Sequence, residues 1–253
     1  MAKIVLCADI HFGVAGRLQD ILWSTRVIRE YCKAANIDTV IVLGDLFHDR
    51  RTIEIDVLSA AAKFFEGLDE CYKRLEEEFT LLRFKNVEAD DLMAYTVKKF
   101  EESDKYDKIW IISTDRDMCQ MLSYTTSQFA YTSRKEYRMS SFYDQLGFDT
   151  PEEYAIFKAV TGDSGDNIST AAEDCGPKRT YAIIRGMTHI TDLIDVLPIA
   201  GKQKYIQRLN AGEAKLLLNW ELTNLREYCE VAINHPNPDN LKLVDEKLKC
   251  LIG

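Results

Sequence analysis

Three short segments of the chain concentrate acidic side chains at spacings that suit metal-dependent chemistry. They are Glu88-Ala89-Asp90-Asp91, Asp115-Arg116-Asp117 and Asp163-Ser164-Gly165-Asp166. Carboxylate oxygens are ligands that Mg²⁺ and Mn²⁺ prefer, whereas zinc sites usually draw on cysteine and histidine. Carboxylates gathered at one place repel one another unless cations neutralise them. The segments therefore predict a centre of two or more Mg²⁺ or Mn²⁺ ions, of the kind that activates a water for phosphodiester hydrolysis.

Apolar runs that each meet an aspartate indicate how the fold would position acidic groups. The runs at 3–8, 38–43 and 109–112 are followed by Asp9, Asp45 and Asp115. Apolar strands that alternate with helical segments are typical of a parallel sheet covered on both faces, and ligands bind at the carboxyl ends of such strands. We therefore predict an α/β fold in which a central parallel sheet is flanked by helices.

Beyond residue 140 the pattern changes to helical segments joined by turns. A polar, glycine-containing stretch runs from Gly162 to Gly176, and a helical segment follows at 178–185. The stretch 202–230 is also helical in pattern, and 234–240 is typical of a loop because it contains two prolines and three asparagines. The sequence thus predicts a helical lobe in the C-terminal part of the chain.

Composition bounds the class of protein without identifying it. The 253 residues are 46% apolar, which allows a sizeable core, and the formal net charge is −9. This charge argues against a surface coated with basic groups, but it allows phosphate contacts on one small basic surface. Seven scattered cysteines without a CxxC pair predict reduced thiols rather than a zinc ribbon or a disulfide framework. We expect a cytoplasmic protein that does not associate with membranes.

The segments Glu88–Asp91, Ile112–Asp117 and Gly162–Ile168 resemble the motifs of the flap endonuclease family, most of all its phage ribonuclease H and 5′-to-3′ exonuclease members. The resemblance covers about residues 64–230 and implies a PIN/flap-nuclease-like fold with a C-terminal helical DNA-binding lobe. It also implies metal-binding roles for six residues, Glu88, Asp90, Asp115, Asp117, Asp163 and Asp166, and catalytic roles for the first four of them.

The same resemblance implies a helix–turn–helix element around 162–181 that grips the backbone of duplex DNA. Lys178 and Arg179, at the start of a helix, are the expected phosphate contacts. The resemblance also allows a K⁺ ion at this element. The family's long basic helical arch has little room here, since only 36 residues separate Arg51 from Glu88.

The first sixty residues carry a different resemblance. Asp9-Ile10-His11 and Gly44-Asp45 are similar to the first two motifs of calcineurin-like metallophosphoesterases, whose later histidine motifs this chain lacks. We therefore expect a division into residues 1–60, a nuclease core at 61–140 and a helical lobe at 141–253. Our hypothesis is that Asp9 and Asp45 complete the metal cluster and that Arg50 and Arg51 contact nucleic acid. The alternative is that both aspartates are ordinary loop residues.

Together these patterns predict a metal-dependent 5′ nuclease acting on DNA or RNA–DNA branches in replication or repair. Two other interpretations stay open at this point. One is a DNA-binding module with impaired catalysis, and the other is a nuclease of the metallophosphoesterase type. A polymerase or a single-strand-binding protein is a possible partner, and for a phage protein the expected location is the host cytoplasm.

Overall fold

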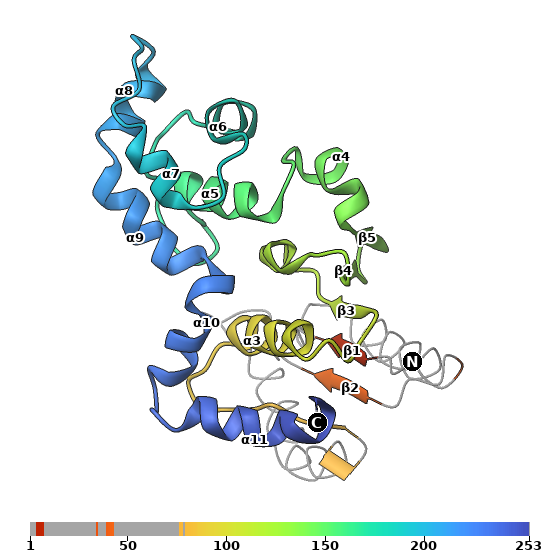
Figure 1. The fold of residues 1–253 in the computed structure, drawn as a ribbon. Helices are drawn as coiled ribbons and strands as arrows, with labels where there is room; N and C mark the ends of the chain where they lie inside the picture. Colours follow the sequence, from red (N-terminus) through yellow and green to blue (C-terminus); the bar gives the residue numbers. More distant parts are fainter. Residues whose placement is uncertain (1–3, 8–33, 35–38, 43–75, 78, 253) are drawn as a thin grey trace, which may run out of the picture.

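The computed structural model describes residues 4–7, 34, 39–42, 76–77 and 79–252. Within these residues a five-stranded sheet has the order β2-β1-β3-β4-β5 (Figure 1). The parallel strands are β1 (Ile4–Cys7), β2 (Thr39–Val42), β3 (Ile109–Ile112) and β4 (Thr126–Ala130), while β5 (Lys135–Tyr137) pairs antiparallel with β4. The predicted central parallel sheet is confirmed, and the antiparallel edge strand is an addition to it.

The register of β2, β1 and β3 aligns the carboxyl ends of these neighbouring strands. Cys7 of β1 pairs with Val42 on one side and with Ile112 on the other. Because these strands are parallel and end at the same level, their carboxyl ends lie at one edge of the sheet. The strand register thus accounts for a shared edge, as the sequence predicted.

Helix α3 (Ala89–Glu102) covers the sheet and forms the centre of a first hydrophobic cluster. Its residues Met93, Val97 and Phe100 recur at helical spacing, are fully buried, and belong to the same cluster as Ile109 and Ile111 of β3. Acidic residues in the first turn and a lysine in the last turn suit the helix dipole. Two C-terminal helices, α10 (Leu225–Asn234) and α11 (Asn240–Ile252), pack into this cluster beside α3 (Figure 1).

A second hydrophobic cluster holds the helical lobe. Its helices are α4 (Phe142–Leu146), α5 (Pro151–Thr161), α6 (Pro177–Ile184), α7 (Ile190–Asp195), α8 (Lys204–Asn210) and α9 (Glu213–Thr223). Thr150 caps α5 by accepting the Glu153 backbone N–H at 3.2 Å, and proline at the first helical position is pre-organised for a helix start. α5 packs against both α6 and α9, so it is the central helix of the lobe.

The short 3₁₀ helix η1 (Asp117–Met121) takes part in both clusters. Met118 and Met121 belong to the first cluster, whereas Cys119 belongs to the second. η1 also packs against α3, α5 and α10. The residue that begins η1, Asp117, is therefore held where the sheet and the helical lobe meet.

The last two helices, α10 and α11, pack with α3 in the first cluster although they follow the helical lobe in the sequence. The guanidinium of Arg226 on α10 donates to Glu101 of α3 at 2.7 Å. The predicted boundaries near residues 60 and 140 stay predictions. None of the helices in the described part of the chain combines the length and apolar character needed to cross a membrane.

Candidate metal centre

The segment that leaves β3 is folded by short polar side chains. Ser113 Oγ accepts the backbone N–H of Asp115 at 3.0 Å, and Asp115 Oδ1 accepts the backbone N–H of Asp117 at 2.7 Å. Side chains of this kind replace backbone partners in turns. The successive bonds end the strand, begin η1 and fix the direction in which the two carboxylates leave the backbone.

The loop after α5 carries the second pair of aspartates. Gly162 directly follows the last residue of α5. Its φ of +68° suits glycine, and a Cβ there would collide with the backbone of Ile168 and Ser169. Asp163 and Ile168 then close a small antiparallel bridge with N···O distances of 2.9 and 2.7 Å. The Gly165 backbone N–H donates to Asp163 Oδ1 at 2.7 Å. This loop is thus a compact, hydrogen-bonded element that holds the Asp163 carboxylate at its beginning.

The structure brings Asp117, Asp163 and Asp166 together. One carboxylate oxygen from each lies within 4.8 Å of the others, and among the described residues no other three acidic, histidine or cysteine side chains do so. The ammonium of Lys158 on α5 lies 2.8 Å from Asp117 Oδ1 and also pairs with Asp163 Oδ2. Three of the six ligands that the family resemblance implies are therefore neighbours. Lys158, which pairs with two of them, is a residue that the sequence patterns had not singled out.

The charges in this group perturb one another strongly. Burial, and then the neighbouring charge of Asp115, raise the pKa of Asp117 to about 6 although Lys158 opposes the rise. Burial also pushes the pKa of Asp163 upward, but hydrogen bonds from Lys158 and from the loop backbone outweigh it and lower that pKa. The carboxylates in turn raise the pKa of Lys158 against its burial.

The donor set fits a divalent cation. Three carboxylates lie together and one ammonium pairs with two of them, so the ionised group has an excess of negative charge. Its ligand atoms are all hard oxygens, without sulfur or imidazole, which suits Mg²⁺ or Mn²⁺ rather than zinc. Asp115 does not belong to the three-residue group, but its carboxylate bonds directly to the Asp117 backbone.

The start of α3 carries a second set of acidic residues. Glu88 precedes the helix, and Asp90 and Asp91 lie in its first turn. Burial, followed by the charge of Glu88, raises the pKa of Asp91 to about 7. Glu88 and Asp90 are not among the three clustered carboxylates, and their predicted role as metal ligands stays a prediction. Asp91 is a strongly perturbed acid that the predicted ligand set did not include.

Four predicted site residues lie outside the described part of the chain: Asp9, Asp45, Arg50 and Arg51. In the sequence, Asp9 follows the last residue of β1 by two positions, and Asp45 follows that of β2 by three. Asp115 likewise follows β3 by three positions. The hypothesis that Asp9 and Asp45 complete the cluster stays a hypothesis that this spacing supports.

The two predicted phosphate contacts of the helical lobe are both exposed at the start of α6. The guanidinium of Arg179 donates to the Asp174 carbonyl at 2.6 Å and lies 5.0 Å from the centre of the Tyr205 ring. Lys178 precedes it directly. Arg179 thus has a structural partner on the lobe, and the phosphate contacts stay predictions.

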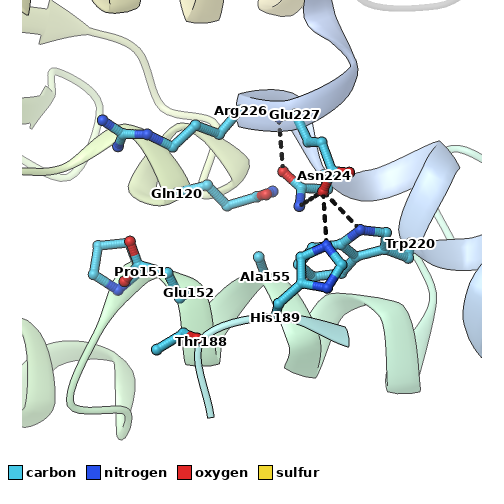
Figure 2. Close-up of a pocket in the computed structure, with 10 residues that line it drawn as sticks. All are labelled: Gln120, Pro151, Glu152, Ala155, Thr188, His189, Trp220, Asn224, Arg226 and Glu227. Atoms are coloured by element: carbon cyan, nitrogen blue, oxygen red, sulfur yellow. Dashed lines mark hydrogen bonds and ion pairs between the residues drawn. The ribbon is translucent and has the colours of Figure 1, made fainter. Parts of the chain in front are cut away.

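A pocket that is distinct from the acidic group lies where η1, α5, α7, α9 and α10 meet (Figure 2). At this junction Glu227 accepts the indole N–H of Trp220 at 2.9 Å and lies 3.3 Å from His189 Nε2. Gln120 Nε2 donates to the Thr223 carbonyl at 2.9 Å. None of the predicted acidic ligands lines this pocket. Its polar contacts tie α10 to the helical lobe.

Similar proteins include nucleases of phage T5. The flap endonuclease of Escherichia phage T5 is 42% identical over 171 residues, which cover 68% of this chain and 58% of that protein. A structure of T5 5′-exonuclease with bound zinc ions is 32% identical, covers 99% of this chain and 100% of that chain, and has a TM-score of 0.82. A T5 flap endonuclease variant in a pseudo-enzyme–product complex with DNA and metal ions is 31% identical, with coverage of 98% for both chains and a TM-score of 0.79. No protein-family model matches the chain.

A mainly parallel sheet, clustered aspartates and an adjoining helical lobe define an acidic-site nuclease fold of the PIN/flap type. With more than 30% identity over an entire solved chain, this protein belongs to the flap endonuclease/5′-3′ exonuclease family. The predicted family and fold class are confirmed. The aligned region spans a little over half of the full-length T5 flap endonuclease. The resemblance of residues 1–60 to metallophosphoesterases concerns segments that lie mostly outside the described residues.

Proposed function

We propose that the protein is a metal-dependent 5′ nuclease that hydrolyses phosphodiesters at 5′ branches of DNA or of RNA–DNA hybrids. The observation that carries this proposal is the group of Asp117, Asp163 and Asp166, whose carboxylates lie within 4.8 Å of one another beside Lys158. Membership in the flap endonuclease family supports it, as does the DNA and metal content of the T5 complex.

The proposed cofactor is Mg²⁺ or Mn²⁺, with two or more ions bound. Asp117, Asp163 and Asp166 would hold one ion, and Glu88, Asp90 and Asp115, with Asp9 and Asp45, would supply further ligands. Such an ion lowers the pKa of a bound water and neutralises charge on a phosphate oxygen. The residues of this chain keep the carboxylates close together, and Lys158 balances part of their charge when the metal is absent.

The proposed nucleic-acid contacts are Lys178 and Arg179 on the helical lobe, together with Arg50 and Arg51, which follow β2 in the sequence. Lys178 and Arg179 lie in the first turn of α6, where the positive end of the helix dipole favours a phosphate. Arg50 and Arg51 would contact the strand near the cleavage point. A K⁺ ion at the 162–176 turn, and a polymerase or single-strand-binding protein as partner in the host cytoplasm, complete the proposal.

The test is cleavage of a 5′-labelled flap duplex in Mg²⁺ or Mn²⁺, with a chelator control. Asp117→Asn should abolish cutting, because it removes a carboxylate from the centre. Asp239→Asn is the matched control, since Asp239 lies in the exposed turn before α11, and it should cut at the normal rate. Flap binding by the wild-type protein without any metal-dependent cutting would refute the proposal and indicate a DNA-binding module instead.

A further inference from the structure

The side chain of Gln128 on β4 forms hydrogen bonds to the segment that carries Asp115 and Asp117. Its side chain is fully buried. The Nε2 group donates to the Ser113 carbonyl at 2.9 Å and to the Asp115 carbonyl at 2.5 Å, while Oε1 accepts the thiol of Cys119 at 3.2 Å. Both N–H groups and the oxygen are therefore used, and the orientation of the amide is fixed because carbonyls accept only from the nitrogen side.

Asn219 of α9 holds the segment that carries Asp163 and Asp166 in a similar way. It is 2% exposed, and its Nδ2 group donates to the carbonyls of Ala159 at 2.9 Å and Ser169 at 3.0 Å. Ala159 lies in the last turns of α5, and Ser169 follows the bridge that closes the loop. One buried amide thus joins the two ends of the segment from which Asp163 and Asp166 extend.

Both amides hold the segments that carry the carboxylates and do not bond to the carboxylates themselves. Each bonds only to backbone or thiol groups outside the carboxylates themselves, and each comes from an element that carries no predicted ligand. Moving either segment would change the distance between Asp117 and the Asp163–Asp166 pair. Groups that orient metal ligands in this indirect way typically affect metal affinity or activity 10- to 100-fold when they are removed.

We propose that Gln128 and Asn219 are positioning residues that set the spacing of the carboxylates for metal binding. This inference rests on the proposed metal-dependent nuclease function. It assigns Gln128 to the Asp115–Asp117 side of the centre and Asn219 to the Asp163–Asp166 side. Neither residue is expected to touch the metal or the substrate.

The experiment compares Gln128→Met and Asn219→Leu, which keep the side-chain size and remove the donors, with Asn240→Leu. Asn240 is a matched control because it is also a buried amide, 4% exposed, whose Nδ2 donates to the Ile233 carbonyl at 2.9 Å between α10 and α11. Mn²⁺ affinity is measured on the full chain by calorimetry, beside kcat and KM on the flap duplex and the urea midpoint of unfolding.

Both test variants should bind Mn²⁺ about 10- to 100-fold more weakly and lose kcat at limiting metal, with an unchanged KM for DNA. Raising the Mn²⁺ concentration should restore much of the lost rate. Asn240→Leu should lower the urea midpoint alone. Cys119→Ala, which removes only the partner of Oε1, should weaken Mn²⁺ binding in the same direction and serves if Gln128→Met does not fold.

Normal Mn²⁺ affinity in folded Gln128 and Asn219 variants would overturn the inference, and so would an equal loss of affinity in Asn240→Leu. The proposed function has a different point of failure. A wild-type protein that binds Mn²⁺ but cuts no flap duplex would refute the proposed nuclease activity. The ratio of Mn²⁺ affinity between each variant and the wild type would still decide the positioning roles. A wild-type protein that binds no Mn²⁺ would refute both.

Discussion

Replacing Lys158 by methionine should destabilise the metal-free protein strongly. The Lys158 ammonium lies 2.8 Å from Asp117 and also pairs with Asp163, and these side chains are only 11%, 17% and 23% exposed. Removing one partner of a largely buried ion pair costs about 3–5 kcal/mol, because the remaining charges stay away from water without a counter-ion. We expect a loss of this size for Lys158→Met, a large fraction of the roughly 5–15 kcal/mol that stabilises a typical domain.

A divalent cation should reverse much of this loss, since it can neutralise the carboxylates in place of the ammonium. Binding at 100 times the dissociation constant adds about 2.7 kcal/mol of stability. In the variant the cation no longer competes with a lysine, so Mn²⁺ should stabilise Lys158→Met more than it stabilises the wild type.

The assay is urea unfolding at neutral pH, once with chelator and once with Mn²⁺. Lys98→Met is the control, because Lys98 makes a 2.7 Å pair with a half-exposed Glu230. Exposed pairs of this kind contribute about 0–1 kcal/mol. The reasoning fails if Lys158→Met is as stable in chelator as Lys98→Met, or if Mn²⁺ stabilises the variant and the wild type equally.

Three further predictions concern the groups around the centre. Because burial and then Glu88 raise the pKa of Asp91 from 3.8 to about 7, the folded metal-free protein keeps a proton that the unfolded chain releases, and its stability should fall as the pH rises through that range. In urea unfolding with chelator, Asp91→Asn should remove up to about 4 kcal/mol of this pH-dependent loss of stability. If the difference in stability between wild type and variant did not change with pH, the raised pKa of Asp91 would be contradicted. Gly162→Ala should weaken Mn²⁺ binding and destabilise more than Gly147→Ala, since both have positive φ but only the first Cβ meets backbone atoms; equal losses in unfolding would rule this out. Deleting residues 225–252 should abolish cooperative thermal unfolding, because it removes the fully buried Ile233, Val244 and Leu248 from the first cluster, each worth about 1.5–3 kcal/mol; a truncated chain that melts at the normal temperature would refute it.

The parts of the fold that the sequence predicted well depend on local patterns. The apolar runs at 109–112 and before Asp9 and Asp45 form strands of the sheet. A parallel strand is buried on both faces, so its sequence is apolar throughout, and this pattern can be recognised locally. The edge strand β5 was not predicted, because two of its three residues, Lys135 and Glu136, are charged and exposed as in a surface loop. Its place depends on pairing with β4, which is a tertiary contact.

The candidate centre was predictable only in its acidic members. Asp117, Asp163 and Asp166 were identified because acidic pairs at short spacing are locally visible. Lys158 lies five residues before Asp163, and its position in the last turn of a helix that leads into a Gly-Asp loop is the signal that was missed. Asn219 offered a weaker signal, as a single amide within the apolar run Leu216-Leu217-Leu218-Asn219-Trp220.

The difference between what was found and what was missed has a physical cause. Carboxylates are recognisable because few other roles require them in pairs, whereas an amide or a lysine acquires its role from the groups that folding brings to it. Asp117 begins η1, whose methionines are buried in the first cluster while Cys119 is buried in the second. The Asp163 loop belongs to the second cluster through α5. The separation of these repelling carboxylates is therefore fixed by how the two clusters join, with Gln128 holding one side and Asn219 the other, and this information exists only in the folded chain.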